Sequence, residues 1–247
     1  KRLCAPRGID LVEDCAQSCG AAIGGRMTGA LTRAAYFTFG ITKNFTTFSG
    51  AMVTCGDEAM HAALVAAVVG FPPARRSRLL KEAVVALGMQ TATTRFIFNI
   101  SLAPVLRCGA PGKADLVNRL FEEKAGAIEP GAFARLGWRP VEAQARAGLR
   151  QLLTIDAKNA ARRRHGAMLS ELLAMQGFGG TPAAAEPGGD HVYMSFAVRC
   201  SDRHRAAARL RRMGVDVSPG YMIDCASVLD LGGRPGLCPN SQAVHDS

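Results

Sequence analysis

The sequence lacks any apolar stretch long enough to cross a membrane as a helix, which needs about 18 to 20 residues. The longest apolar candidate, residues 59–71, contains His61 and is stopped by Pro72 and Pro73. A hydrophobic run behind the basic pair at the start of the chain is also missing, so no secretory signal is recognisable. We therefore expect no membrane association and a location in the cytoplasm.

The eight cysteines lack the spacing of a zinc site. Cys15 and Cys19 form one Cys-x3-Cys pair, but no second Cys/His pair at a matching distance accompanies it. We predict that the protein binds no metal. The cysteines are interpreted as small buried thiols in a reducing compartment.

Acidic residues are few compared with basic ones, at 20 against 30, and the net charge is +10. Such an excess is typical of proteins that bind nucleic acids. However, the arginines are spread along predicted helices, and no basic strand with interleaved aromatic residues accompanies them. We predict an arginine-rich solvated surface and no nucleic-acid partner, and a nucleic-acid binder is kept as an alternative.

Short apolar runs predict strands in the first 55 residues and helices after them. We expect strands at residues 9–12, 36–39 and 50–55, separated by glycine-containing turns. Asp57 is predicted to cap a helix that runs to about Val69, with Leu64, Val65 and Val68 on one side. The fold class indicated is α/β.

The second half predicts one long helical block and then a smaller α/β unit. Apolar residues recur at three- and four-residue spacing within residues 141–175. Alternation in residues 191–200 predicts a half-buried strand. Ser201 and Asp202 are predicted to cap a basic helix that ends near Gly214, and residues 215–217 to begin another strand. The apolar positions of the helical block are Leu149, Leu152, Leu153, Met168, Leu169, Leu172 and Leu173.

Two polar residues follow the first predicted strand. Asp14 ends it, and a buried carboxylate there needs a cationic partner, such as the protonated ring nitrogen of a pyridine cofactor. Gln17 lies one helical turn further on the same side, where its amide could reach that ring. The alternative is a helix start, with Asp14 as the N-cap and Gln17 as its capping-box partner.

Two further polar residues follow the second predicted strand. Thr38 precedes a turn that contains Gly40, and a hydroxyl with turn N–H groups can bind phosphate. Lys43 has apolar and aromatic neighbours, which favour the uncharged amine that imine chemistry requires. The alternatives are an ordinary strand threonine and a surface lysine.

Together these residues form a motif series. It reads Glu13-Asp14-Cys15-Ala16-Gln17, Phe37-Thr38-Phe39, Thr42-Lys43-Asn44 and Gly50-Ala51-Met52-Val53-Thr54. The series resembles the DegT/StrS-type sugar-nucleotide aminotransferases, which are pyridoxal 5'-phosphate (PLP) enzymes of fold type I. A weaker likeness continues through Gln144-Ala145, Gly148-Leu149 and Gln151-Leu152. The family's upstream part has no counterpart, so we expect a fragment that lacks an N-terminal part and a C-terminal end.

The resemblance implies roles for the four residues. Lys43 would form the Schiff base and move protons, Asp14 would pair with the pyridine nitrogen, Gln17 would contact the ring's hydroxyl side, and Thr38 would bind phosphate. The substrates implied are a nucleotide-linked keto-sugar and an amino-acid donor, by family analogy glutamate, in a homodimer.

The resemblance also implies a division of the chain. Residues 1–140 would be the C-terminal portion of the large PLP-binding domain, with a mostly parallel sheet and helices. Residues 141–176 would be linking helices, and 177–247 an incomplete small domain. Two alternatives remain: a non-catalytic homologue, and a PLP-dependent sugar dehydratase, a class that carries histidine in place of the lysine.

Overall fold

The computed structural model describes residues 2–101, 103–104, 137–178, 188–215, 217 and 238–239. The chain divides into two compact units. The first comprises Lys1–Ala86 and Phe133–Ala197, and the second comprises Leu87–Ala132 and Val198–Ser247. No helix in the described ranges combines the length and the apolar character that a bilayer crossing needs. All four predicted site residues lie in the first unit.

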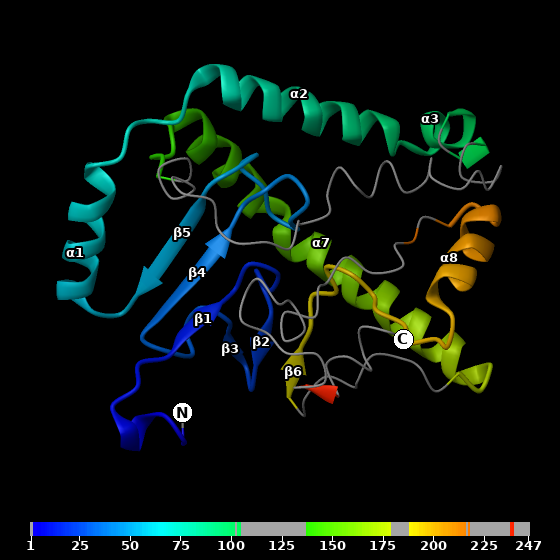
Figure 1. Ribbon diagram of the computed structural model, residues 1–247, viewed down its shortest axis with the longest axis horizontal. Coiled ribbons are helices and arrows are strands. Elements are labelled where there is room, and N and C mark those ends of the chain that lie inside the picture. Colours follow the sequence, from blue (N-terminus) through cyan, green and yellow to red (C-terminus); the bar gives the residue numbers. More distant parts are fainter. Residues whose placement is uncertain are drawn as a thin grey trace. The chain divides into compact units, whose positions relative to one another are not determined.

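A three-stranded sheet forms the centre of the first unit (Figure 1). Its strand order is β1-β4-β5, so β4 has a neighbour on each side. β4 pairs with β1 in parallel and with β5 antiparallel. The strands are β1 (Val12–Asp14), β4 (Ala34–Thr38) and β5 (Ala51–Cys55).

The core of this sheet lies on the inner face of β4. Ala35 and Phe37 are buried there with Cys15, which follows β1. Tyr36, between the two, is exposed, because successive side chains of a strand point to opposite faces. The same alternation therefore places a hydroxyl on the face of β4 opposite the apolar cluster.

A second, small sheet has the order β3-β2-β6 and is antiparallel throughout. It consists of β2 (Ala22–Ile23), β3 (Arg26–Met27) and β6 (Gly189–Asp190). The predicted α/β class is confirmed. The expected mostly parallel sheet is not what the described strands form, because β1–β4 is the one parallel pair among their four pairings. β5 pairs antiparallel with β4 after the loop of residues 39–50, an arrangement that needs no crossover helix.

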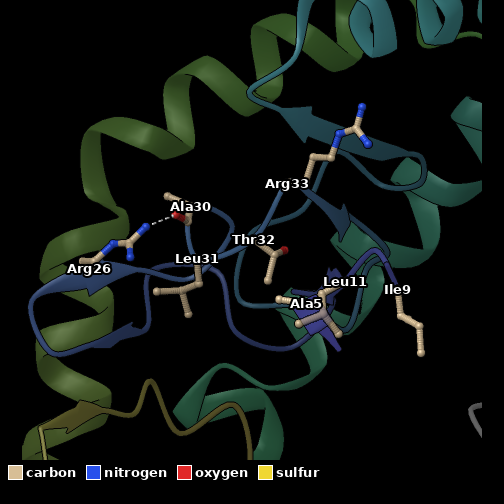
Figure 2. Close-up of a pocket in the computed structure, with 8 residues that line it drawn as sticks. All are labelled: Ala5, Ile9, Leu11, Arg26, Ala30, Leu31, Thr32 and Arg33. Carbon is tan, nitrogen blue, oxygen red and sulfur yellow. Dashed lines mark hydrogen bonds between the residues drawn. The ribbon is translucent and has the colours of Figure 1, made fainter. Parts of the chain in front are cut away.

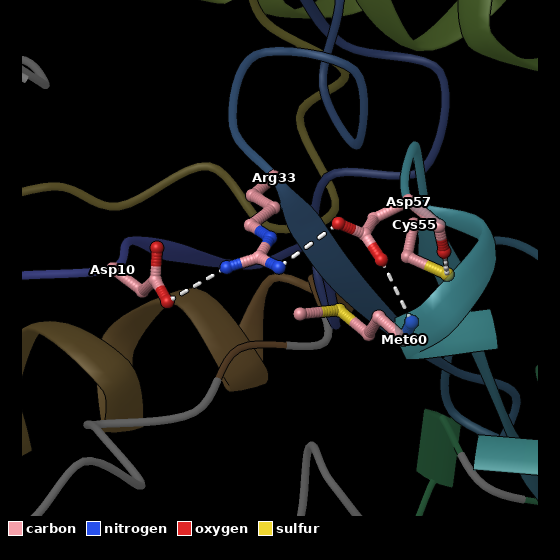
Figure 3. Close-up of polar contacts among 5 residues, drawn as sticks. All are labelled: Asp10, Arg33, Cys55, Asp57 and Met60. Atoms are coloured by element: carbon pink, nitrogen blue, oxygen red, sulfur yellow. Dashed lines mark hydrogen bonds and ion pairs between the residues drawn. The ribbon is translucent and has the colours of Figure 1, made fainter. Parts of the chain in front are cut away.

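Helix α1 (Glu58–Val69) is confirmed as predicted. The Asp57 carboxylate caps it by accepting a hydrogen bond of 2.8 Å from Met60 N. Asp57 also pairs with Arg33 at 2.9 Å, and Arg33 reaches Asp10 at 3.1 Å (Figure 3). The capping bond and the guanidinium lower the pKa of Asp57. Arg33 thus joins the segment before β1 to the start of α1.

The 34-residue helix α7 (Glu142–Met175) confirms the predicted helical block, but its buried face is not the expected one. The apolar residues Leu149, Leu152 and Leu153 are 63%, 52% and 86% exposed. Apart from Ile155, the buried residues are small or polar. The buried residues are Gln144, Gly148, Ile155, Asn159 and Gly166.

Between α1 and α7 the structure describes α2 (Arg76–Ala92) and α3 (Arg95–Ile100). The segments on either side of this region meet in the first unit. Arg139 N donates to Pro72 O at 2.8 Å, and Ala74 N donates to Arg139 O at 2.9 Å. The guanidinium of Arg75 lies 5.4 Å from the Trp138 ring centroid, within reach of a cation–π interaction.

Two strand predictions need correction. The first strand begins at Val12 rather than at residue 9, so Glu13 and Asp14 are part of the strand. The strand predicted at residues 191–200 is wrong, because the strand in this region, β6, ends at Asp190. Tyr193 has φ of 45°, a left-handed conformation that interrupts an extended chain. Its ring instead contacts those of His191 and Phe196.

In the second unit, the basic helix is confirmed as α8 (Arg203–Arg212). The Asp202 carboxylate accepts a hydrogen bond of 2.9 Å from Arg205 N, as expected of its cap. The strand expected at residues 215–217 includes residue 216, which lies outside the described residues. Val215 and Val217, on either side of it, are not in a strand.

Candidate functional site

Asp14 is the last residue of β1, and its side chain is exposed. The carboxylate accepts a hydrogen bond of 2.9 Å from Ala16 N. Residues 15–20 form turns rather than a helix, so the alternative of a helix N-cap is wrong. This turn carries Asp14 at the carboxyl end of a strand, the place where open α/β sheets bind ligands.

The carboxyl group of Asp14 is held in its ionised form. Hydrogen bonds from the Tyr36 hydroxyl and the Ala16 amide lower its pKa against the opposing effect of burial. The positive charge of Lys43 lowers the pKa of Asp14 further, which indicates that the two residues interact electrostatically. The site therefore combines an ionised carboxylate with the side chain of Lys43.

Tyr36 is a site residue that the motif series did not identify. It lies opposite Asp14 in the parallel β1–β4 register. Its hydroxyl hydrogen-bonds with the Asp14 carboxylate, and this interaction raises the pKa of Tyr36. The available signal was its position two residues before Thr38, which puts both side chains on the same face of one strand.

Gln17 is exposed in the turn that follows Asp14. The helical spacing predicted to place it on the same side as Asp14 is wrong, because no helix forms in residues 15–20. Its contact with a cofactor ring stays a prediction.

Thr38 is the last residue of β4, directly before the loop of residues 39–50, which contains a turn at residues 41–42. Its backbone pairs with Ala51 of β5, and its side chain is half-buried. The structure thus places its hydroxyl beyond Tyr36 on the strand that borders the Asp14 segment. Phosphate binding by Thr38 stays a prediction.

Lys43 lies in the loop of residues 39–50, with its side chain half-buried. Its backbone N–H donates to Gly40 O at 3.1 Å and closes a turn. The Phe39 and Phe45 rings pack edge to face, with centroids 5.0 Å apart, on either side of this turn in the sequence. Further along the loop, Phe48 has φ of 71°, an unusual conformation for a bulky residue.

Two glutamine side chains of helix α7 form hydrogen bonds with the later part of this loop. Gln144 Nε2 donates to Thr47 O at 3.2 Å and to Ser49 O at 3.1 Å. Gln151 exchanges hydrogen bonds with Thr46, accepting from its N at 3.1 Å and donating to its O. Residues 144, 148 and 151 share one helix face, because their spacing is four and three. The sequence likeness at Gln144, Gly148 and Gln151 therefore coincides with the face that holds the Lys43 loop.

The start of the loop is held by asparagine side chains. Asn44 Nδ2 donates to Cys19 O at 2.8 Å and to Asn159 Oδ1 at 3.3 Å. Asn159 Nδ2 donates to the same Cys19 carbonyl at 3.1 Å. Arg163, one helical turn beyond Asn159, donates to Gly20 O at 3.0 Å. The Asp14 turn, the Lys43 loop and α7 thus meet at one point.

Glu13 fixes the loop before β4. Its carboxylate accepts from Gly29 N at 2.9 Å, Leu31 N at 2.7 Å and Thr32 N at 2.8 Å. Burial raises the pKa of Glu13, but the three backbone N–H groups outweigh burial and the net pKa is lowered. Of the two adjacent acids, Glu13 therefore uses its carboxylate to hold the backbone of the preceding loop, whereas the carboxylate of Asp14 is exposed.

The Cys15 and Cys19 thiols are not activated nucleophiles. Burial raises the pKa of both, so they are protonated at neutral pH. In the described part of the chain, no three His, Cys, Asp or Glu side chains lie close enough together to hold a metal ion.

A cavity of about 350 Å³ lies apart from the predicted residues (Figure 2). Arg26, at its edge, donates a hydrogen bond of 2.6 Å to Ala30 O. Arg33, also in the lining, is engaged by Asp10 and Asp57. Neither cation is thus free for a ligand, and none of the four predicted residues contributes. The lining residues are Ala5, Ile9, Leu11, Arg26, Ala30, Leu31, Thr32 and Arg33.

Solved structures with a similar fold include two aminotransferases and one dehydratase. A DegT DnrJ EryC1 StrS aminotransferase from Brucella abortus has a TM-score of 0.62 at 16% identity, covering 99% of this chain and 52% of its own. The aminotransferase TlmJ from Streptoalloteichus hindustanus has a TM-score of 0.59 at 18% identity, and the match covers 99% of this chain and 53% of TlmJ. The E. coli GDP-4-keto-6-deoxy-D-mannose-3-dehydratase with bound hydrated PLP has a TM-score of 0.58 at 16% identity, and the match covers 100% of this chain and 56% of the dehydratase.

At these identities the likeness establishes the fold, and the chain spans about half the length of each of these structures. A comparison with curated proteins found no match. The model of the DegT/DnrJ/EryC1/StrS aminotransferase family matches residues 1–99, which include β1, β4, the Lys43 loop and all four predicted site residues. The resemblance predicted from the motif series is thus confirmed over residues 1–99, which are similar to the DegT/DnrJ/EryC1/StrS aminotransferase family.

Proposed function

We propose that this chain carries the lysine-bearing part of a PLP-dependent aminotransferase that acts on a nucleotide-linked keto-sugar. The observation that supports this most is the position of Asp14 at the end of β1 and of Lys43 in the loop after β4, within the segment that matches the family. When bound, PLP supplies an aldehyde for an amine and a ring that accepts electrons.

The described residues fit such a group. Asp14 is exposed and its pKa is lowered, so at neutral pH it offers the negative charge that a protonated ring nitrogen needs. The Tyr36 hydroxyl and the Ala16 amide occupy part of its hydrogen-bonding capacity and hold it in place. A carboxylate has about four acceptor sites, so room remains for one further donor.

Lys43 is proposed to hold the cofactor's aldehyde carbon through a Schiff base. With the cofactor bound, the Lys43 Nζ amine would also act as the base that takes a proton from the amino donor and returns one to the acceptor. Thr38 is proposed to donate its hydroxyl to the phosphate, and Gln17 its amide to the ring's hydroxyl side. We further propose that the amino donor is glutamate, that the protein acts as a homodimer and that it is located in the cytoplasm.

A second candidate is suggested by the fold shared with the E. coli GDP-4-keto-6-deoxy-D-mannose-3-dehydratase. Lys43 favours the transaminase, because an amine can form a Schiff base and an imidazole cannot. A third candidate is a homologue without turnover. The three differ in two measurable properties, imine formation and the transfer of an amino group.

The test is to add PLP to the purified protein and record the imine absorbance, then to add glutamate. We expect the absorbance to form with the native chain, to be bleached by glutamate and to be absent in Lys43→Ala. Lys158→Ala is the matched control, because Lys158 is an exposed lysine on α7. A Lys43→Ala protein that keeps the imine would refute the assignment. An imine that glutamate leaves unchanged would favour the homologue without turnover.

A further inference from the structure

Asn44 and Asn159 share one acceptor, the backbone carbonyl of Cys19. Asn44 Nδ2 lies 2.8 Å from this oxygen and Asn159 Nδ2 lies 3.1 Å from it. The two side chains are also joined to each other, since Asn44 Nδ2 lies 3.3 Å from Asn159 Oδ1. Two amides and one carbonyl therefore form a closed set of hydrogen bonds, which we call the asparagine node.

The asparagine node is withdrawn from water. Asn159 is 1% exposed and Asn44 is 9% exposed. A buried amide that loses its partner keeps the cost of desolvation without the compensating bond. Each member of the node is thus held in place by the other two, and removal of one amide leaves the other incompletely bonded.

The node joins the two segments that carry the charged groups of the site. Cys19 belongs to the turn that begins after Asp14, whereas Asn44 directly follows Lys43 in the loop. Asn159 links both segments to α7, and Arg163 adds a bond of 3.0 Å to Gly20 O, the residue after Cys19. Among the described residues, the bond from Asn44 to Cys19 O is the one side-chain hydrogen bond that joins residues 15–20 directly to residues 39–50.

We propose that Asn44 and Asn159 are positioning residues that fix the Lys43 loop on the Asp14 turn and so set the distance between the amine and the carboxylate. This inference rests on the proposed function for its purpose, because a cofactor held at both ends requires a constant separation of the two groups. The hydrogen bonds of the asparagine node themselves do not depend on the proposed function. Neither residue touches a cofactor in this role.

The first experiment measures the Asp14–Lys43 interaction without cofactor. The pKa of Asp14 is followed by carboxyl carbon NMR in the native chain, Lys43→Met, Asn159→Leu and the double variant, with the resonance assigned by Asp14→Asn. Lys43→Met removes a charge that lowers the pKa of Asp14, so we expect an upward shift in the native background. We expect the shift to be lost or reduced in the Asn159→Leu background.

Gln144→Leu is the control for general loss of stability. Gln144 belongs to the same helix and holds the same loop, but at Thr47 and Ser49. We expect Gln144→Leu to lower the melting temperature and to keep the full effect of Lys43→Met on Asp14. Asn44→Ala, which removes the node from the loop side, should behave like Asn159→Leu and replaces it if that variant does not fold. An equal effect of Lys43→Met in all backgrounds would overturn the inference.

A second measurement separates this inference from the proposed function. Hydrogen exchange of the PLP-free protein should show about tenfold or faster exchange in both residues 15–20 and residues 40–45 of Asn159→Leu, and in neither segment of Gln144→Leu. Loss of protection in one segment alone would contradict a shared node. A native chain that forms no imine with PLP would refute the proposed function, while the NMR and exchange results would still decide the role of the node.

Discussion

Replacement of Gly166 by alanine tests how α7 packs against the segment after β6. A Cβ atom at Gly166 would lie 2.7–2.8 Å from three atoms of the Tyr193 ring, well inside normal contact. Gly88 in α2 is the matched control, because a Cβ there meets nothing within 4 Å. Both glycines are inside helices, so the gain in helix propensity is the same at both positions, about 1 kcal/mol.

The expected result follows from adding the two effects. Overpacking of a well-packed site costs about 1–3 kcal/mol, so Gly166→Ala should change the free energy of unfolding by about 0 to −2 kcal/mol after the helix gain. Gly88→Ala should raise it by about 1 kcal/mol. The two variants should thus differ by about 1–3 kcal/mol, or roughly 2–12 °C in melting temperature for a chain of this size.

Urea unfolding followed by circular dichroism measures this difference. A third variant, Tyr193→Ala, removes the ring, and Gly166→Ala made in that background should stabilise as Gly88→Ala does. Non-additivity of this kind is expected of residues in contact. The packing argument would be refuted if Gly166→Ala stabilised the native protein as much as Gly88→Ala does.

Two further predictions concern the loops around the site. Glu13→Gln should lower the free energy of unfolding by about 1–2 kcal/mol at pH 7, because an amide cannot accept all the N–H groups that the carboxylate accepts. The pKa of Glu13 is lowered in the folded state from its ordinary 4.5, so the Glu13 carboxylate stabilises the fold above pH 4.5 and loses this effect as the pH falls below 4.5. The urea midpoints of the native protein and Glu13→Gln should therefore converge in acid. Gln144→Leu should cost about 1–3 kcal/mol at neutral pH, because Thr47 O and Ser49 O lose their buried donor; an unchanged urea midpoint would show that these carbonyls do not depend on it.

The sequence indicated candidate site residues, whose roles stay predictions, but it indicated their surroundings less well. Asp14 and Lys43 could be proposed because a strand-end acid and a loop lysine occur within a motif series that a family shares. Gln17 was placed on a helix that does not form, because Ala16 N turns back to the Asp14 carboxylate. The pairing of Tyr36 with Asp14 could not be predicted, since it depends on which strands are neighbours and in which register.

The buried face of α7 shows why apolar periodicity was insufficient. The three- and four-residue spacing of leucines correctly predicted a helix, but the leucines Leu149, Leu152 and Leu153 are exposed. The helix is buried along Gln144, Gly148 and Asn159, because the loops it covers present backbone carbonyls and N–H groups that need polar partners. The strand expected after β6 failed for a local reason, the left-handed backbone of Tyr193.

The central position of β4 makes the site sensitive to insertions and deletions. One residue added between Arg33 and Tyr36 would reverse the faces of every later side chain in the strand, and would turn an apolar residue toward Asp14 in place of the Tyr36 hydroxyl. Two added residues would restore the faces but move Tyr36 about 6–7 Å along the strand, out of reach of Asp14. Length changes in relatives of this chain should therefore be more frequent in the β2–β3 turn at Gly25, where a Cβ atom would meet nothing within 4 Å, than in β4.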